Sequence, residues 1–239
     1  MSTLRNALAW AIESVRRRGP LTTLAIAAGT IEDGFFDHRF GTETSRVVDS
    51  DQLEAGLANR AHAVRYKATR ARPFQALLRR LPLPENSTFV DVGAGKGKVL
   101  LLAAQHPFKR VVGIEFSKPL CDQARRNIEI FRQRVRKLAP IEVIEADVTQ
   151  HTFQGDENVF FLYNPFDAVI LGRFIENVRR SVEAHPRQVW LIYSTPLYAS
   201  VLSTSGLFTR TDAVSLGGTE FQIYTNQAGG QIRTPPSNR

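Results

Sequence analysis

The sequence predicts an α/β fold in which helices cover both faces of a mostly parallel sheet. Two observations support this fold class. From residue 88 onward, short runs of β-branched and aromatic residues alternate with longer helical patterns, and the first strand-to-helix junction is a glycine-rich turn. The chain has 239 residues and is 43% hydrophobic, which is enough to fill the core of one large domain.

The element order follows from the periodicity of each segment. The predicted strands are β-branched or aromatic runs near residues 88–92, 110–114, 141–145, 158–163, 188–193, 208–214 and 219–225. The predicted helices lie near residues 97–106, 117–137, 168–184 and 197–204. The last two strands are separated only by residues 215–218, so we expect them to form a hairpin.

The N-terminal third lacks this alternation. Residues 2–18 show the stripe of an amphipathic basic helix that Gly19 and Pro20 end, and a loop-rich stretch is expected to follow through residue 44. Residues 51–81 read as helical, with a break at Pro73. We therefore predict three parts, listed here in chain order: a helical extension or lid over 1–84, an α/β domain over 85–226 and a disordered tail over 227–239.

The formal net charge of +8 is concentrated in two clusters. One lies between Glu54 and Glu85, an interval without acidic residues, and the other follows the second strand at residues 125–137. Solvated helix faces explain such clusters most simply. An anionic partner such as nucleic acid is an alternative, disfavoured because no nucleic-acid motif or interleaved aromatic residue accompanies the charge.

Composition also limits the cellular compartment and excludes some kinds of disulfide and metal site. The single cysteine, Cys121, excludes a disulfide framework and a cysteine-rich zinc site, and the five histidines lack metal-ligand spacing, so no metal is expected. The apolar stretch at residues 21–28 is too short to span a bilayer. We expect a cytoplasmic protein without a membrane span.

The glycine-rich turn carries the strongest functional signal. Asp91 ends the first strand, and Gly93, Gly95 and Gly97 follow at alternate positions before the helix. Glycines allow positive φ and let a ligand approach the backbone. The dinucleotide fingerprint would need a third glycine at Lys98, and no phosphate-binding G-x-x-x-x-G-K-[ST] run exists. The turn resembles motif I of the class I S-adenosylmethionine (SAM)-dependent methyltransferases.

Three further motifs extend the resemblance. Glu115 ends the second strand, Asp147 follows the third and Asn164 follows the fourth. An acidic side chain at Glu115 can accept hydrogen bonds from the ribose hydroxyls of a nucleoside. Four motifs in the expected order, each at the carboxyl end of a strand, imply a Rossmann-like sheet of seven strands, ordered 3-2-1-4-5-7-6 with the last strand antiparallel.

The resemblance also implies the residues of a SAM site. Asp91 would orient the methionine amino end, Glu115 would hold the ribose, and Phe116 would border the adenine together with Asp147 and Val148. The whole set that we expect to contact the cofactor is Asp91, Gly93, Ala94, Gly95, Gly97, Glu115, Phe116, Asp147, Val148 and Asn164.

The fourth motif, Asn164-Pro165-Phe166, indicates the acceptor side. It resembles the D/N-P-P-Y/F motif of N-methyltransferases, in which amide and backbone carbonyls align an amino group and the aromatic ring stacks on the acceptor. This chain has no second proline, and Phe166 comes one position early. The difference weakens the case for stacking on a nucleobase and leaves polar alignment of an amine.

Segments before motif I are loosely similar to the seven-strand histone-lysine methyltransferase family. They are residues 36–44 and residues 66–69, and the similarity extends to motifs I and IV. It implies that Tyr66 and Thr69 form a lid over the cofactor or line an acceptor channel. Together with Asn164, Pro165 and Phe166, Tyr66 completes the expected catalytic set.

These observations predict a SAM-dependent methyltransferase that N-methylates an amine, such as a protein lysine. The alternatives are a small-molecule methyltransferase, a binding module that keeps the fold without catalysis, and an NAD oxidoreductase, which the glycine spacing disfavours. The sequence leaves open the identity of the methyl acceptor and the oligomeric state.

Overall fold

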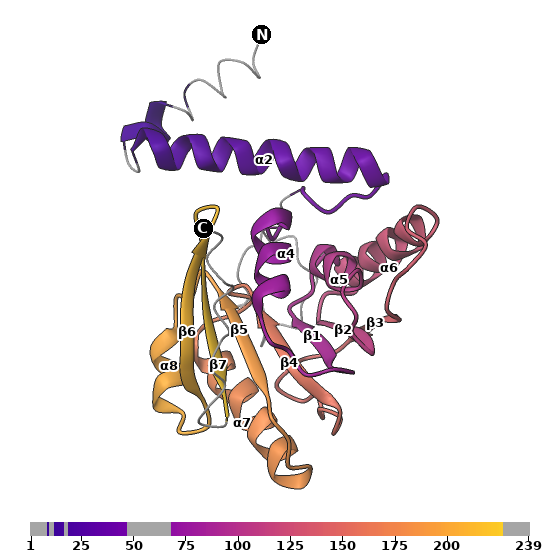
Figure 1. The fold of residues 1–239 in the computed structure, drawn as a ribbon, viewed down its shortest axis with the longest axis vertical. Coiled ribbons are helices and arrows are strands. Elements are labelled where there is room, and N and C mark those ends of the chain that lie inside the picture. The colour runs from indigo at the N-terminus through magenta and orange to yellow at the C-terminus, as the bar shows by residue number, and fades with distance from the viewer. Residues whose placement is uncertain (1–8, 10–11, 17–18, 47–67, 227–239) are drawn as a thin grey trace, which may run out of the picture.

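A seven-stranded mixed sheet forms the centre of the molecule, with the strand order β3-β2-β1-β4-β5-β7-β6 (Figure 1). The computed structural model describes residue 9 and residues 12–16, 19–46 and 68–226. The strands are β1 (Thr88–Val92), β2 (Arg110–Glu115), β3 (Ile141–Glu145), β4 (Glu157–Leu162), β5 (Trp190–Ser194), β6 (Thr209–Leu216) and β7 (Thr219–Thr225). The predicted order is confirmed.

Pairing within the sheet places the functional edge. Strands β1 to β5 pair in parallel, whereas β7 runs antiparallel to both β5 and β6. The carboxyl ends of the five parallel strands therefore meet at one edge of the sheet, and the tip of the β6–β7 hairpin lies at that same edge. Ligands of such sheets bind where the carboxyl ends of the strands meet.

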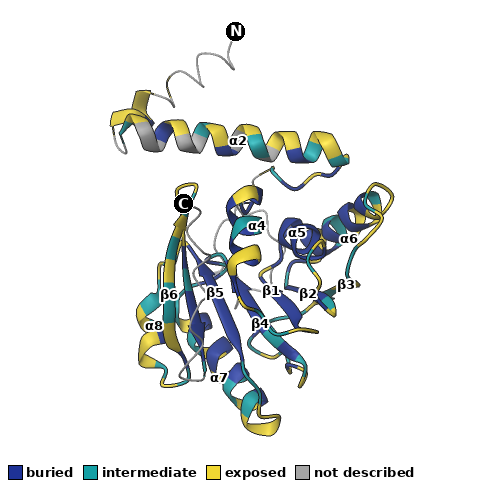
Figure 2. Ribbon diagram, viewed as in Figure 1, coloured by how far each residue is buried: buried dark blue, intermediate teal, exposed yellow. Residues whose placement is uncertain are grey.

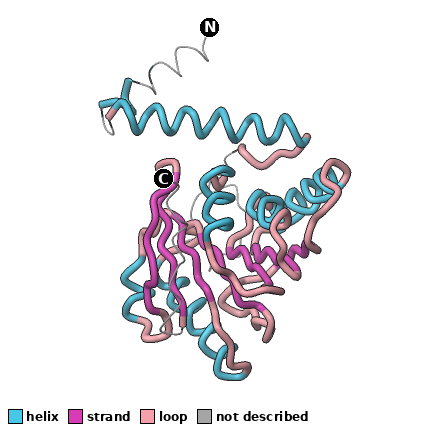
Figure 3. The backbone as a smooth tube through the Cα atoms, viewed as in Figure 1, coloured by secondary structure: helices cyan, strands magenta, loops and turns pink. Residues whose placement is uncertain are grey.

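Helices cover both faces of the sheet, as the alternation of the sequence predicts (Figure 3). Their bounds are α2 (Pro20–Phe40), α4 (Ala71–Arg80), α5 (Lys98–Ala103), α6 (Lys118–Arg132), α7 (Ala168–Ala184) and α8 (Ala199–Thr204). Helices α4, α5 and α6 pack on one face, which includes Phe89 and Phe161, and α7 and α8 pack on the other, which includes Phe160 and Leu191.

Burial follows the same division. The central strands β1, β4 and β5 are buried almost throughout, and most described positions of α2 are exposed or intermediate (Figure 2). Successive side chains of a strand alternate between the two apolar clusters, so β1 to β5 and β7 contribute to both, whereas β6 contributes to the first alone. In the described part of the chain, no helix is long and apolar enough to cross a membrane.

The N-terminal part differs from the prediction. The loop-rich stretch expected through residue 44 is wrong for residues 20–40, which form the helix α2. Pro20 occupies the first turn, where its missing N–H costs nothing, and Gly41 ends the helix with a left-handed φ of 68°. The Gly19-Pro20 pair thus starts a second helix as well as ending the first pattern.

Most of the other predicted helices have bounds that differ from those in the structure. Pro73 does not break a helix, because α4 begins at Ala71 and the proline falls within its first turn. The rest of the helical segment expected at residues 51–81 falls largely on residues 47–67, which lie outside the described residues, and so does the predicted tail at 227–239. Helix α7 has the predicted bounds.

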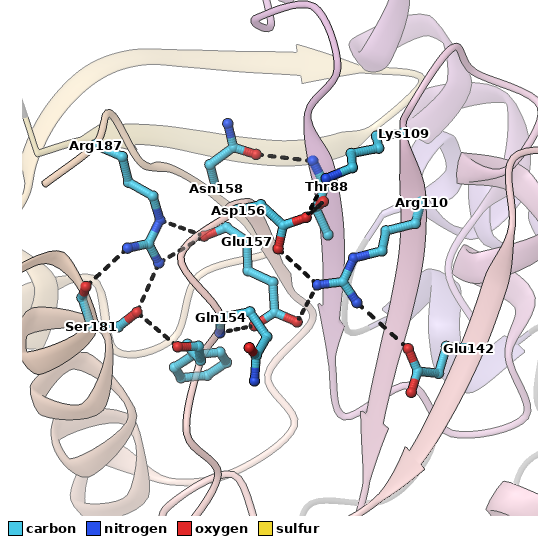
Figure 4. Close-up of polar contacts among 11 residues, drawn as sticks. Thr88, Lys109, Arg110, Glu142, Gln154, Asp156, Glu157, Asn158, Ser181 and Arg187 are labelled. Carbon is cyan, nitrogen blue, oxygen red and sulfur yellow. Dashed lines mark hydrogen bonds and ion pairs between the residues drawn. The ribbon is translucent and has the colours of Figure 1, made fainter. Parts of the chain in front are cut away.

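A charged cluster joins the amino ends of the strands, at the edge opposite the glycine turn (Figure 4). The Arg110 guanidinium bonds Asp156 at 2.8 Å and Glu157 at 3.4 Å, and Lys109 bonds Asp156 at 2.9 Å. Arg187 donates to the backbone carbonyl of Glu157 at 2.9 and 3.0 Å. These bonds tie the starts of β2 and β4 to the end of α7.

Asp156→Asn should lower the free energy of unfolding at pH 7. The Asp156 side chain is 36% exposed and screened by solvent, so we expect a loss of only about 1 kcal/mol. Hydrogen bonds from Arg110, despite some burial, hold the pKa of Asp156 below its ordinary value. The stabilisation by Asp156 is therefore complete above the unfolded-state pKa of about 3.9. It is lost as the pH falls from that value through the lower folded-state pKa.

Urea unfolding at pH 7 and at lower pH values measures this difference. Wild type and variant should converge as the pH is lowered towards 3. The matched control is Asp122→Asn, which removes exposed contacts to Lys118 and Arg125 on α6 and should have a smaller effect. A loss that is equal in both variants, or that does not depend on pH, would contradict this reading of the cluster.

Candidate cofactor site

The glycine turn between β1 and α5 is shaped by the motif at the end of β4. Gly93 has a φ of 78° and Gly97 a φ of 81°, which L side chains rarely adopt. A Cβ on Gly93 would lie 2.3 Å from the Cβ of Pro165, and one on Gly97 would lie 3.1 Å from that of Ala124. Motifs I and IV are therefore in direct contact, and side chains are excluded from the turn for both conformational and steric reasons.

Glu115 ties the end of β2 to the glycine turn. Its Oε2 accepts a hydrogen bond from the Gly95 N–H and its Oε1 accepts one from the Ser117 N–H, both at 2.9 Å. Burial raises the pKa of Glu115, and these backbone donors partly offset the increase. Each carboxylate oxygen retains one further lone pair for a ligand.

Asp91 is a second buried carboxyl group on the same face of the sheet. In the register of β1 and β2 it lies opposite Gly113, two residues before Glu115. Burial, and then the negative charge of Glu115, raise the pKa of Asp91 well above its ordinary value. Among the described residues, no group donates a hydrogen bond to this carboxyl. A ligand ammonium group is the partner that such a buried carboxylate lacks.

The predicted adenine side lies after β2 and β3. Phe116 is half-buried, directly after Glu115. Asp147 Oδ1 accepts hydrogen bonds from the N–H and hydroxyl of Thr149, both at 2.8 Å. This carboxylate oxygen therefore already stabilises the turn. Val148 is buried, and its carbonyl accepts a hydrogen bond from Asn177. The adenine contacts themselves remain predictions.

The motif at the end of β4 is a strained turn held by side-chain hydrogen bonds of Asn164. Asn164 has a left-handed φ of 44°, and Thr195 at the end of β5 has one of 49°. The Asn164 amide donates to the Thr195 carbonyl at 2.6 Å and accepts from the Tyr193 hydroxyl at 2.7 Å and the Leu197 N–H at 3.2 Å. Strained residues of this kind persist where the surroundings over-determine them, and they cluster at functional sites.

Of the two aromatic residues expected on the acceptor side, only Phe166 lies within the described residues. Phe166 is 9% exposed, and its ring packs in the core 6.3 Å from that of Phe174, on the α7 face. Tyr66 lies outside the described residues, whereas Thr69 is described and buried. The sequence-based roles of both aromatic residues thus remain predictions. Within the described ranges, no three His, Cys, Asp or Glu side chains could hold a metal ion together.

The structure also reveals residues that the motifs did not indicate. The segment 41–46 lies against the glycine turn, where Lys96 Nζ contacts Glu43 Oε1 at 2.6 Å. Asn127 on α6 is fully buried and bonds the backbone of both. The one signal in the sequence is that Asn127 interrupts the apolar stripe of Leu120, Ala124 and Phe131.

The fold is that of the class I SAM-dependent methyltransferases. The buried carboxyl of Asp91 and the open glycine turn suit the amino acid end of SAM, and the oxygens of Glu115 suit its ribose. Residues 50–183 match the family model described as "Histone methylation protein DOT1", which is more than half of the chain. The chain belongs to this family, and SAM is its cofactor.

Curated relatives include two proteins named trans-aconitate 2-methyltransferase. The protein from Variovorax paradoxus (strain S110) is 40% identical over 76 residues, which is 31% of this chain and 29% of the relative. The protein from Paracidovorax citrulli (strain AAC00-1) is 34% identical over 100 residues, 41% of this chain and 35% of the relative. The matches thus span about a third of the length of these relatives.

Solved structures support the fold. A SAM-dependent methyltransferase from Aquifex aeolicus has a TM-score of 0.50 and 16% identity, covering 64% of this chain and 88% of its own. The putative methyltransferase yhhF from Escherichia coli has a TM-score of 0.51 and 16% identity, covering 66% and 88%. At this identity the likeness concerns the fold alone.

Asp91→Asn should weaken the binding of S-adenosylhomocysteine (SAH) and stabilise the protein without ligand. The carboxylate that pairs with the ligand ammonium is lost, which we expect to cost about tenfold or more in affinity. Because the folded-state pKa of Asp91 is raised, stability decreases as the pH rises through that pKa, and a neutral amide removes this penalty.

Calorimetric titration over a pH series and thermal unfolding check both effects. SAH affinity of the wild type should fall as the pH is lowered and Asp91 becomes protonated, and the variant should lack this component of the pH dependence. The same affinity and pH profile in wild type and variant would exclude Asp91 from the site.

Proposed function

We propose that this enzyme transfers the methyl group of SAM to an amine nitrogen held at the Asn164–Pro165 turn, such as the side chain of a protein lysine. The observation that carries the proposal is the contact between Gly93 and Pro165, because it brings the acceptor motif directly against the cofactor turn. The description of the family as histone methylation proteins supports the same acceptor class.

The chain's own residues would bind the cofactor, align the acceptor with it and exclude water from the site. When bound, SAM supplies a methyl group activated on a sulfonium, so catalysis requires alignment more than a protein nucleophile. Asp91 would fix the methionine end of the cofactor, and Glu115 would hold its ribose. The Asn164 Oδ1 already accepts two hydrogen bonds within the protein, so it would hold the turn and leave backbone carbonyls to meet the acceptor.

Tyr193 would serve as a donor and not as the base. Burial raises the pKa of its phenol, so the hydroxyl stays protonated at neutral pH and donates to Asn164. An amine acceptor must lose its proton before attack. This proton would be released to solvent through the acid–base equilibrium of the amine itself.

A small carboxylate acceptor is the second candidate, and two observations favour it. The two curated relatives are named for trans-aconitate, an organic acid. A cavity of about 640 Å³ lies between α2, the start of α4 and the β6–β7 hairpin tip, and its lining includes Arg70 and Arg72 among mainly apolar residues. Figure 1 shows α2 above this hairpin and α4. Arg72 is exposed and lies 3.8 Å from Glu32, which also lines the cavity, whereas Arg70 is half-buried. With two arginines and one carboxylate, the lining has a net positive charge that would attract a carboxylate and disfavour a basic histone segment.

Transfer of a labelled methyl group distinguishes the two acceptors. The enzyme is incubated with labelled SAM and either histone proteins, lysine peptides, trans-aconitate or lysate fractions. An N-methyl product survives mild base, whereas a methyl ester is hydrolysed. Base-stable label on a lysine supports the proposal, and base-labile label found only on a small acid would replace it with the second candidate.

Asn164→Ala should slow methyl transfer about 100-fold, the order of effect seen when an aligning hydrogen-bond network at a reacting centre is removed. SAH affinity should stay within about threefold, because the side chain does not hold the cofactor turn. Rates with the base-stable acceptor and calorimetric titration with SAH measure both.

Asn164→Gly separates the side chain from the backbone strain. Glycine adopts the left-handed φ of 44° without penalty, so any remaining loss reflects the missing amide. Wild-type turnover in both variants would show that the amide network does not serve the reaction.

A further inference from the structure

A fully buried asparagine on α6 joins two segments that are far apart in the sequence. Asn127 Nδ2 donates to the carbonyl of Lys96 at 2.9 Å and to that of Glu43 at 3.1 Å. Its Oδ1 accepts from the Glu43 N–H at 2.9 Å, and from Gln123 at 3.2 Å. Every hydrogen-bonding position of the amide is therefore in use.

One of the two segments is the cofactor turn itself. Lys96 lies between Gly95, whose N–H bonds Glu115, and Gly97, whose φ is 81°. The peptide groups on either side of Lys96 are flexible because of the neighbouring glycines. The turn has backbone bonds of its own, such as that from the Gly97 N–H to the Ala94 carbonyl at 2.9 Å. The bond from Asn127 adds a restraint on the orientation of the Lys96 carbonyl.

The other segment is rigid by itself. The Asp37 carboxylate accepts hydrogen bonds from Thr42, Thr44 and Ser45, including the backbone N–H groups of the last two. Burial alone would raise the pKa of Asp37, but these donors together hold it below its ordinary value. Residues 42–45 therefore form a preordered turn that a few bonds can hold in place as a unit.

An ion pair joins the same two segments beside the asparagine. Lys96 Nζ lies 2.6 Å from Glu43 Oε1, with the lysine side chain 5% and the glutamate side chain 52% exposed. The pair brings the positive charge of a buried lysine to the protein surface. Asn127 holds the backbones of these two residues, and the ion pair holds their side chains.

We propose that Asn127 is a positioning residue for the cofactor: it locks the motif I turn to the segment 41–46 in the geometry that binds SAM. The inference rests on the SAM site described above and adds to it a residue that contacts neither the cofactor nor the acceptor. A turn positioned in advance loses less conformational freedom when the ligand binds, so the lock should contribute to affinity.

A purely structural role makes a different prediction, and the chain offers a matched control. Asn226 also bonds two backbone groups, accepting from the Val189 N–H at 2.9 Å and donating to the Arg187 carbonyl at 2.9 Å. It lies at the amino end of β5, on the edge of the sheet opposite the cofactor turn. Replacing it removes similar bonds without affecting the site.

The experiment compares Asn127→Ala, Asn127→Ser and Asn226→Ala by calorimetric titration with SAH and by urea unfolding. Loss of the Asn127 bonds should weaken SAH binding about tenfold or more, whereas serine, which retains one donor, should have an intermediate effect. Asn226→Ala removes two backbone bonds at a half-buried position, so it should lose less stability than Asn127→Ala and keep SAH affinity within about twofold.

A milder variant and a second readout cover the case in which Asn127→Ala does not fold. Glu43→Gln changes a half-exposed side chain and cuts only the ion pair, and should weaken SAH binding about threefold. Hydrogen exchange in Asn127→Ser should quicken at the amides of Glu43 and of residues 93–97, and remain unchanged in β4 and β5.

The outcomes separate this inference from the assignment of the cofactor. Weaker SAH binding in the Asn127 variants with an unaffected Asn226 variant supports the lock. Wild-type affinity in Asn127→Ser and Glu43→Gln, or equal losses in the Asn226 control, would overturn it. A wild-type protein that itself does not bind SAH would instead contradict the SAM site.

Discussion

The hydrogen bond from the Gly95 N–H to Glu115 is the interaction on which the site depends. It links the turn after β1 to the end of β2, so the two strand ends act as one surface. Gly113 leaves room for this packing, because a Cβ there would lie 2.6 Å from the Leu100 side chain and 2.8 Å from that of Ala94. Burying Glu115 so deeply costs solvation, which backbone N–H groups partly offset.

Further energetically unfavourable features lie at the same edge of the sheet. Asp91 is a buried carboxyl with a raised pKa, and Asn164 and Thr195 hold left-handed backbones. At the opposite edge the carboxylate of the buried Glu157 is instead paired with the Arg110 guanidinium, and Arg187 donates to the Glu157 backbone carbonyl. Paired charges at the amino ends of the strands thus support the fold, whereas we expect the buried carboxyl groups at the carboxyl ends to contact a ligand.

The sequence predicts the strand order and the SAM class because these depend on local patterns. A glycine turn after a buried strand and an acidic residue at the end of the next are visible in residues 89–115. Helix α2 was missed because Gly19-Pro20 ends one helix and begins another. A proline at the first helical position is as typical of a start as of a stop.

Asn127, by contrast, could not be assigned from the sequence. Its bonds to Glu43 span 84 residues, and no local pattern indicates which segment a buried amide will meet. The hydrogen bonds of Asn164 are equally non-local, because its partners Tyr193, Thr195 and Leu197 lie at or just after the end of β5. The acceptor remains undecided for the same reason: it depends on how α2 and the hairpin tip lie relative to the motif IV turn.

The most direct test of the central claim is a calorimetric titration of the full chain with SAM, SAH and NAD. The geometry of Asp91, the glycine turn and Glu115 predicts micromolar binding of SAM and SAH and no binding of NAD. Binding of NAD, or of none of the three, would contradict the assignment of this edge as a SAM site.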